Sequence, residues 1–192
     1  MARTRRQALT RPDVVEAALK CIARDGVEGL GVHRVAAELG IKAPSLYNHV
    51  SSQEELRVAV CVAGWSRFAD RAHAALRSHG VGPGAIMAIA KAFRAFVKEN
   101  PALYQVMSTV HVEQSTTEFA QVADRIFYVF SQALAPLNLS QDDFIHAIRA
   151  LRAAVHGFSQ LEVSGQFGMP YDIEKSFEWM INAFTHSLET RS

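Results

Sequence analysis

Hydrophobic residues recur at intervals of three and four along most of the chain, which is the period of an amphipathic α-helix. Before the glycine-rich break at residues 78–84 (SHGVGPG), this pattern predicts helices over residues 11–25, 32–39, 44–50 and 53–76. After the break, it predicts helices over residues 85–99, 102–109, 116–134, 140–164 and 172–188. No stretch has the alternation of a β-strand. We therefore expect an all-α fold, with a head of three helices that the fourth helix joins to a larger helical body.

The shortest predicted helices lie between residues 32 and 56. The first of them ends at Gly40, where a helix C-terminus favours left-handed backbone, and Pro44 suits the first turn of the next helix. Leu46 and Val50 give this second helix one buried face. Its other side chains are polar or aromatic: Ser45, Tyr47, Asn48 and His49. Packing does not account for such an outward face, whereas a helix-turn-helix uses one to enter the major groove of DNA.

Charge is distributed unevenly along a chain whose formal net charge is only +1. Residues 1–11 contain Arg3, Arg5, Arg6 and Arg11 and no acidic residue. A basic arm beside a unit that fits the major groove indicates a local electrostatic contact with DNA, in which Arg3, Arg5 and Arg6 reach the adjacent minor groove. The alternative for these arginines is a disordered basic tail.

The composition excludes several classes of protein. Apolar residues make up 49% of the chain and charged residues 20%, which favours a folded chain over a disordered one. Cys21 and Cys61 lie on apolar helical faces, as expected of buried thiols in a reducing compartment rather than of a disulfide. The N-terminus lacks an apolar signal region, and no apolar run approaches the ~18 residues of a membrane span. We therefore expect a cytoplasmic protein with no membrane partner.

Nothing in the sequence indicates catalysis. The chain has no G-x-S-x-G, P-loop, glycine fingerprint or H-E-x-x-H motif, and none of its eight histidines has another four residues away. Glu54 and Glu55 fit the first turn of a helix rather than a catalytic pair. We therefore expect no enzymatic activity, no catalytic residue, no metal site and no cofactor.

Three blocks resemble, in order and spacing, the TetR family of bacterial transcriptional regulators: residues 35–41 (VAAELGI), 46–50 (LYNHV) and 54–56 (EEL). The resemblance covers residues 10–57. Two positions depart from it: Val50, where the family often has an aromatic residue, and Gln53, where it often has a lysine. The second departure removes a candidate phosphate contact. Residues 100–104 (NPALY) and 155–167 resemble the WHG-type C-terminal domain of one branch of the family.

The resemblance implies three parts: a flexible basic arm at residues 1–9, a helix-turn-helix DNA-binding domain at 10–57, and an effector-binding and dimerisation domain at 58–192. The helix that begins near residue 53 would link the two domains. The resemblance also implies a function, namely a repressor that binds a pseudo-palindromic operator as a homodimer and is released by a small molecule.

Individual residues of the head can be given roles on DNA. Ser45 and Asn48 can both donate and accept hydrogen bonds at base edges. Lys42 is placed for a phosphate, because a cation at a helix N-terminus is otherwise unfavourable; the alternative is a solvated lysine. Tyr47 can reach a phosphate or pack on the first helix, and His49 can bind phosphate or belong to the core. The predicted DNA-binding residues are Arg3, Arg5, Arg6, His33, Arg34, Lys42, Ala43, Pro44, Ser45, Tyr47, Asn48, His49 and Ser52.

The body is expected to provide a pocket and a dimer contact. An apolar or aromatic effector would bind among residues of an aromatic-rich set: Phe93, Phe96, Tyr104, Met107, His111, Phe127 and Phe130. The last two long helices would form the dimer contact, usually a four-helix bundle in TetR-like proteins, through Ile148, Leu151, Val155, Phe158, Phe177, Ile181 and Phe184. The alternative for each residue of both sets is ordinary intramolecular core.

A second function remains compatible with the same head. The chain would then be an adaptor or protein-interaction module whose helix-turn-helix no longer binds specific DNA sequences. Lys42, Tyr47 and the basic arm argue against this alternative, and Gln53 argues slightly for it.

Overall fold

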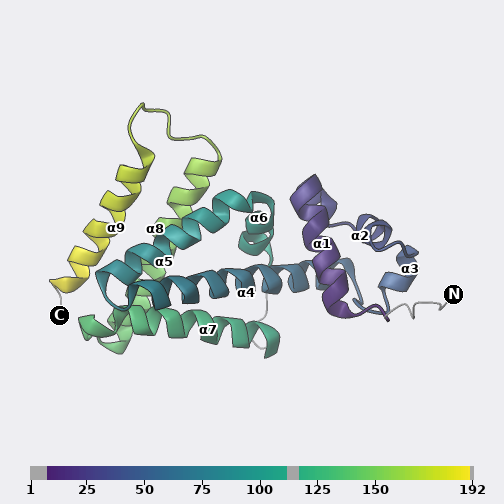
Figure 1. The fold of residues 1–192 in the computed structure, drawn as a ribbon, viewed down its shortest axis with the longest axis horizontal. Helices are drawn as coiled ribbons and strands as arrows, with labels where there is room; N and C mark the ends of the chain where they lie inside the picture. Colours follow the sequence, from purple (N-terminus) through teal and green to yellow (C-terminus); the bar gives the residue numbers. More distant parts are fainter. Residues whose placement is uncertain (1–7, 112–116, 191–192) are drawn as a thin grey trace. The chain divides into compact units, whose positions relative to one another are not determined.

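The computed structural model describes residues 8–111 and 117–190, and within these ranges the chain is helical and has no β-strand (Figure 1). The helices are α1 (Arg11–Asp25), α2 (Val32–Glu38), α3 (Ala43–Leu46), α4 (Gln53–His79), α5 (Pro83–Glu99), α6 (Pro101–Thr109), α7 (Thr117–Leu134), α8 (Gln141–Val163) and α9 (Ile173–Glu189). Two short 3₁₀ turns, η1 (Val27–Gly29) and η2 (Ala135–Leu137), follow α1 and α7. The predicted all-α fold is confirmed. None of the helices in the described ranges is long and apolar enough to cross a membrane.

The chain divides into two compact units. The head unit combines Met1–Trp65 with Ala102–Glu113, and the body unit combines Ser66–Pro101 with Gln114–Ser192. The division falls inside α4, after Trp65; the resemblance implied a boundary at residue 57, within the helix that it gave as the link between the domains. Helix α4 is thus one continuous helix that contributes residues to both units.

The head unit forms around α1, whose start is set by local chemistry. The Thr10 hydroxyl accepts a hydrogen bond from the Asp13 amide, and the Asp13 carboxylate accepts one from the Thr10 amide at 2.8 Å, which completes a capping box. The buried face of α1 packs on η1 and α2, and α2 packs on α3. The core of the unit includes Val14, Val35 and Leu46, all fully buried.

The body unit is organised around α5, which packs against α7, α8 and α9. Phe93 and Phe96 of α5 also contact Phe68 of α4, with ring centroids 5.0 Å and 6.1 Å apart. The buried residues of α8 and α9, among them Leu151 and Phe177, are the faces that these helices turn toward the rest of the unit. Helix α5 is therefore the central element of this core.

A buried ion-pair network joins α5 to α8 and α9. The guanidinium of Arg94 donates two hydrogen bonds to the carboxylate of Glu162, at 2.6 Å and 2.8 Å, and one to Glu174. It also lies over the ring of Phe177, 4.8 Å from the centroid. Only 8% of the Arg94 side chain and 9% of the Glu162 side chain are exposed, and Lys98 adds a second cation 2.6 Å from Glu162. The two bonds to Glu162 fix α8 against α5, and the bond to Glu174 links α9 to the same side chain.

Candidate nucleic-acid interface

The turn between α2 and α3 is closed by backbone hydrogen bonds alone. Gly40 has a φ of 66°, in the left-handed region, as its place at the end of α2 predicts. Its amide donates to the Ala37 carbonyl and the amide of Ile41 donates to the Ala36 carbonyl, each at 3.0 Å. These two bonds form a Schellman motif, which ends α2 and turns the chain into the next helix.

Helix α3 is shorter than the sequence pattern predicts. The α-helix ends at Leu46, and residues 47–49 continue as turns in which the amide of His49 bonds to the Leu46 carbonyl, three residues back. Leu46 and Val50 are fully buried and anchor both ends of this segment. The predicted buried face is therefore present on a single helical turn and the tighter turns that follow it.

The side chains predicted to contact DNA are mostly exposed on this segment. Half of the Tyr47 side chain is accessible, and Lys42, Pro44, Ser45 and Asn48 are exposed as well. Among the described residues, the side chains of Lys42, Ser45, Tyr47 and Asn48 have no hydrogen-bond or ion-pair partner. Exposed polar groups that no neighbour in their own unit engages are available to an external partner.

The other predicted DNA-binding residues are placed in different surroundings. His33 and Arg34 are exposed on α2, where Arg34 lies 3.5 Å from the carboxylate of Asp25. Ala43 and His49 are half-buried. Ser52 is exposed, but its hydroxyl accepts a hydrogen bond from the Glu55 amide at 3.0 Å and so caps α4. Three further residues, Arg3, Arg5 and Arg6, lie outside the described residues.

Glu55 stabilises the same helix start from its other side. Its carboxylate accepts hydrogen bonds from the hydroxyl and the amide of Ser51, both at 2.6 Å. These two bonds, with a smaller contribution from nearby Arg11, hold the pKa of Glu55 below its usual range. The start of α4, which follows the candidate recognition segment directly, is therefore firmly held at neutral pH.

Gln53 has a role that sequence reasoning missed. Its side-chain oxygen accepts a hydrogen bond from the Val32 amide at 3.1 Å, and its side-chain nitrogen donates to the Leu30 carbonyl. Val32 is the first residue of α2, whose N-cap Gly31 offers no side chain, so Gln53 supplies the cap from α4. A lysine cannot accept the bond from Val32. The departure at this position is thus explained by a structural role within the head unit, and it no longer supports the adaptor alternative.

Replacing Gln53 by alanine is expected to lower the free energy of unfolding of the head unit by about 1–2 kcal/mol, since two backbone groups lose their partner. Gln53→Lys should be destabilised to a similar extent, because it restores only a donor. Urea denaturation measures both values, with the exposed Gln121→Ala in α7 as the control. A Gln53→Ala protein as stable as the control would show that this cap contributes nothing.

The structure places the aromatic residues predicted to line an effector pocket in different surroundings. Phe93, Phe96, Tyr104 and Met107 are buried in the cores, His111 and Phe127 are exposed, and Phe130 is half-buried. The set is also divided, since Tyr104, Met107 and His111 belong to the head unit and the others to the body unit. Met107 packs closely against α4: a Cβ added to Gly64 would lie 2.6 Å from its sulfur. An aromatic-rich sequence does not by itself distinguish a filled core from a pocket.

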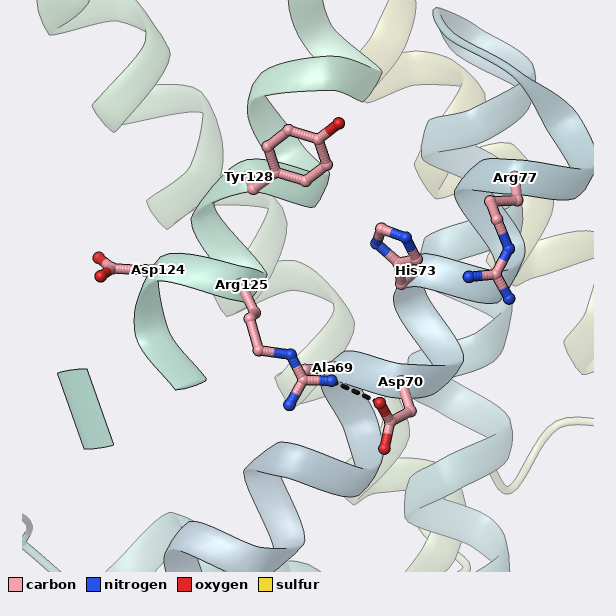
Figure 2. Close-up of a pocket in the computed structure, with 7 residues that line it drawn as sticks. All are labelled: Ala69, Asp70, His73, Arg77, Asp124, Arg125 and Tyr128. Atoms are coloured by element: carbon pink, nitrogen blue, oxygen red, sulfur yellow. Dashed lines mark hydrogen bonds and ion pairs between the residues drawn. The ribbon is translucent and has the colours of Figure 1, made fainter. Parts of the chain in front are cut away.

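A pocket of about 490 Å³ lies in the body unit, between α4 and α7 (Figure 2). It is lined by Ala69, Asp70, His73, Arg77, Asp124, Arg125 and Tyr128. The sequence pattern singled out none of these residues, because polar side chains on helical surfaces have no distinguishing spacing. The described residues contain no cluster of histidine, cysteine or acidic side chains that could hold a metal ion.

The residues predicted to form the dimer contact differ in how far they are buried within the chain. Leu151, Val155, Phe177 and Ile181 are buried inside the protomer, and Ile148, Phe158 and Phe184 are half-buried. The apolar stripes of α8 and α9 therefore mark the faces that pack within the body unit, where α5 contacts both helices. The four buried residues leave no surface for a second copy of the chain.

Comparison with known proteins identifies related sequences over both units. The family model described as "Bacterial regulatory proteins, tetR family" matches residues 14–60, and "Tetracyclin repressor-like, C-terminal domain" matches residues 86–184. The HTH-type transcriptional regulator YobS of Bacillus subtilis is 29% identical over 184 residues, which is 95% of this chain and 94% of YobS. The regulator Rv0681 of Mycobacterium tuberculosis is 28% identical over 187 residues, which is 96% of this chain and 84% of that protein.

Solved structures share the fold over almost the whole chain. A protein from Rhodococcus sp. RHA1 has a TM-score of 0.79 at 17% identity, covering 98% of this chain and 100% of its own. A TetR variant from Acinetobacter baumannii AYE, in complex with minocycline, has a TM-score of 0.72 at 17% identity, covering 95% and 98%. BioQ with its double-stranded DNA operator has a TM-score of 0.64 at 20% identity, covering 95% and 99%.

The C-terminal family match covers more than half of the 192 residues and includes the two blocks that resembled such a domain in the sequence. The N-terminal match includes α2, α3 and the start of α4, where the exposed polar side chains lie. The chain belongs to the TetR family of bacterial regulatory proteins: it is a transcriptional regulator with a DNA-binding helix-turn-helix and is not an enzyme.

Proposed function

We propose that this regulator is a ligand-responsive repressor, which binds a pseudo-palindromic operator as a homodimer and is released by a small molecule. The observation that carries the DNA-binding part is the α3 segment, where buried Leu46 and Val50 hold Lys42, Ser45, Tyr47 and Asn48 exposed and without partners among the described residues. BioQ, whose fold is similar, has been solved with its operator, which supports the same use of this segment.

Within this proposal the exposed side chains divide into two roles. Ser45 and Asn48 read base edges in the major groove, because each can both donate and accept hydrogen bonds. Lys42 and Tyr47 contact phosphates and set the position of the segment on the duplex. The predicted contacts of Arg3, Arg5 and Arg6 with the minor groove belong to the same proposal.

Alanine substitutions at Lys42 and Asn48 test these roles, and we expect the two substitutions to affect DNA binding in different ways. Lys42→Ala should weaken binding to every duplex and reduce the slope of log affinity against log salt by about 1, since one phosphate contact is lost. Asn48→Ala should relax the preference at one base pair, at a cost of roughly 1–3 kcal/mol there. Fluorescence anisotropy on operator and random duplexes measures both, with Lys20→Ala, an exposed lysine on α1, as the control.

Two outcomes would contradict the DNA roles. A wild-type protein without affinity for random duplex at low salt, or with an affinity that salt does not change, would exclude a phosphate-binding head. If Asn48→Ala weakens all sequences equally, Asn48 contacts the DNA backbone and its assignment to base reading is wrong.

The homodimer contact is proposed on the outward faces of α8 and α9 instead of the buried stripes. On α9 the positions Trp179, Ala183 and His186 share one helical face, and 74% of the Trp179 side chain is exposed. Trp179 and Tyr171 line a shallow pocket of about 330 Å³ that also includes Asp172, Lys175 and Ser176. A large exposed aromatic beside a concavity fits the anchor residues of protein interfaces.

Replacing Trp179 by glutamate is therefore expected to raise the dimer dissociation constant about 100-fold, because a central anchor is replaced by a charge that the interface would have to desolvate. Sedimentation equilibrium measures the change. The control is Val81→Glu, which places the same charge on another exposed apolar side chain of the body unit. Equal dissociation constants for the two variants would exclude the α9 face from the dimer contact.

Release by a small molecule completes the proposal. A ligand that binds the body unit and favours a dimer arrangement with weaker DNA binding lowers the operator affinity by the coupling free energy. A coupling free energy of about 1–3 kcal/mol corresponds to a 5- to 150-fold change in operator affinity. The TetR variant from Acinetobacter baumannii, which has a similar fold, has been solved with minocycline, and this supports ligand binding by the fold in general. Helix α4 contributes residues to both units, so it is the proposed path of coupling.

A further inference from the structure

The pocket between α4 and α7 combines a flat aromatic surface with a free cation. The rings of His73 on α4 and Tyr128 on α7 lie nearly parallel, at 27°, with centroids 6.1 Å apart. About half of the Tyr128 side chain is exposed, so part of its ring is open to a ligand. Figure 2 shows the two rings beside one another, one from each helix. A planar molecule can cover such a surface with little loss of conformational freedom.

The charged groups of the pocket are not equivalent. Arg125 donates hydrogen bonds to the carboxylate of Asp70 and, at 3.1 Å, to the hydroxyl of Ser66, so its charge is already compensated. The carboxylate of Asp124 points away from the other lining side chains (Figure 2). Arg77 is exposed and has no ion-pair or hydrogen-bond partner among the residues that the structure describes. It is therefore the cation of this pocket that is available to an anion.

We infer that this pocket binds a planar aromatic anion, of the class of aromatic carboxylates. The ring of the ligand stacks on Tyr128 and His73, and its carboxylate receives hydrogen bonds from the guanidinium of Arg77. Arginine suits this contact because its planar donors match the geometry of a carboxylate. The volume of about 490 Å³ accommodates a ligand of two fused rings, since drug-sized sites begin near roughly 300 Å³.

This inference specifies the ligand response and its site. The role of this ligand as the effector rests on the proposed function. Binding of the ligand to the pocket does not depend on that function. His73 and Arg77 lie on the part of α4 that belongs to the body unit, and the same helix begins in the head unit with Gln53. A ligand that ties α4 to α7 is thus placed on the element that the two units share.

Calorimetry on the full-length protein with 2-naphthoate as the probe tests the site. Wild type is expected to bind 2-naphthoate, and the neutral isostere 2-naphthamide should bind at least 10-fold more weakly because Arg77 loses its charged partner. Arg77→Gln should weaken 2-naphthoate binding at least 10-fold and leave 2-naphthamide binding unchanged. Tyr128→Ala should weaken both ligands. Lys20→Gln on α1 removes one positive charge elsewhere and should leave both affinities unchanged.

The possible results separate the site from the proposed function. Absence of 2-naphthoate binding, or equal affinities of wild type and Arg77→Gln, overturns the site. Operator affinity measured with and without saturating 2-naphthoate tests the effector role, and we expect it to fall at least 5-fold for wild type and to stay constant for Arg77→Gln. Unchanged operator affinity of liganded wild type overturns the effector role. A protein that binds 2-naphthoate but no DNA overturns the proposed function and leaves the site intact.

Discussion

A Gly29→Ala protein is expected to lose about 2–3 kcal/mol of unfolding free energy in the head unit, near the upper end of the usual cost of overpacking. Gly29 is the buried last residue of η1, which packs against α1. A Cβ at this position would lie 2.3 Å from the carbonyl oxygen of Cys21 and 2.6 Å from its carbonyl carbon. Both are backbone atoms of a helix, so neither can rotate away, and η1 must move off α1 to make room.

Hydrogen exchange detected by mass spectrometry gives this prediction a unit-specific readout. Amides of α1 should open with a lower free energy in Gly29→Ala, and amides of α5 in the body unit should be unaffected. The matched control is Gly31→Ala, where the nearest atom to the added Cβ, the Glu28 carbonyl oxygen, is 4.0 Å away. Its φ of −99° suits alanine, so the control should cost at most about 1 kcal/mol, for the weaker N-cap. Equal losses in the two variants would show that the close approach at Cys21 is not what destabilises the head.

A Glu162→Gln protein is expected to lose about 3 kcal/mol of stability in the body unit, which lowers the melting temperature by about 6–12 °C. The substitution preserves the shape of the side chain and removes the charge that Arg94 contacts through two hydrogen bonds. Arg94 then keeps Glu174 as its acidic partner, but nearly half of that side chain is exposed. The cost arises because a guanidinium that is only 8% exposed is left with weaker compensation.

The pH dependence of stability tests the same network. Hydrogen bonds from Arg94, and then from Lys98, hold the pKa of Glu162 below its usual range. A carboxyl whose folded pKa is lowered contributes stability that is fully present above its unfolded pKa, about 4.3, and is lost as the pH falls through the folded value. The stability of wild type should therefore decline below about pH 4.3 more steeply than that of Glu162→Gln.

The matched control for both measurements is Glu178→Gln. Glu178 lies 2.5 Å from Lys91, and about 40% of each side chain is exposed. Removal of this surface pair is expected to cost less than about 1 kcal/mol. Thermal unfolding of the three proteins at neutral pH, repeated between pH 3 and 6, supplies all the values. A Glu162→Gln protein that melts with the Glu178→Gln control would show that the buried network does not stabilise the body unit.

Apart from the end of α3, local signals in the sequence predicted the helices and their ends closely. The helix at residues 11–25 begins at the cap Thr10 and is bounded as its pattern indicated, and Gly40 has the left-handed backbone expected after α2. Helices α5 to α9 begin and end within about two residues of the predicted positions. Caps, proline and glycine act over a few residues, so their effect can be read without knowledge of the fold. The helix-turn-helix was predictable for the same reason.

The sequence pattern was least informative about which buried face meets which partner. A stripe such as Phe177 and Ile181 on α9 shows that one face of a helix is covered, but not whether another helix of the same chain or a second protomer covers it. The structure assigns these residues to the core of the body unit and leaves Trp179 exposed on α9. Similarly, the aromatic set that suggested a pocket contains Phe93 and Phe96, which pack against Phe68.

By itself the sequence determined the class of fold, the order of its helices and the exposed residues of the segment that we propose to read DNA, because each depends on neighbours a few positions away. Only the tertiary structure decided the roles that depend on residues far apart in the chain. Gln53 caps α2 from α4, Glu162 pairs with Arg94 across 68 residues, and Gly29 differs from Gly31 only through its distance to α1. Residue type and spacing do not predict such distances, because the distances depend on how the helices pack against one another.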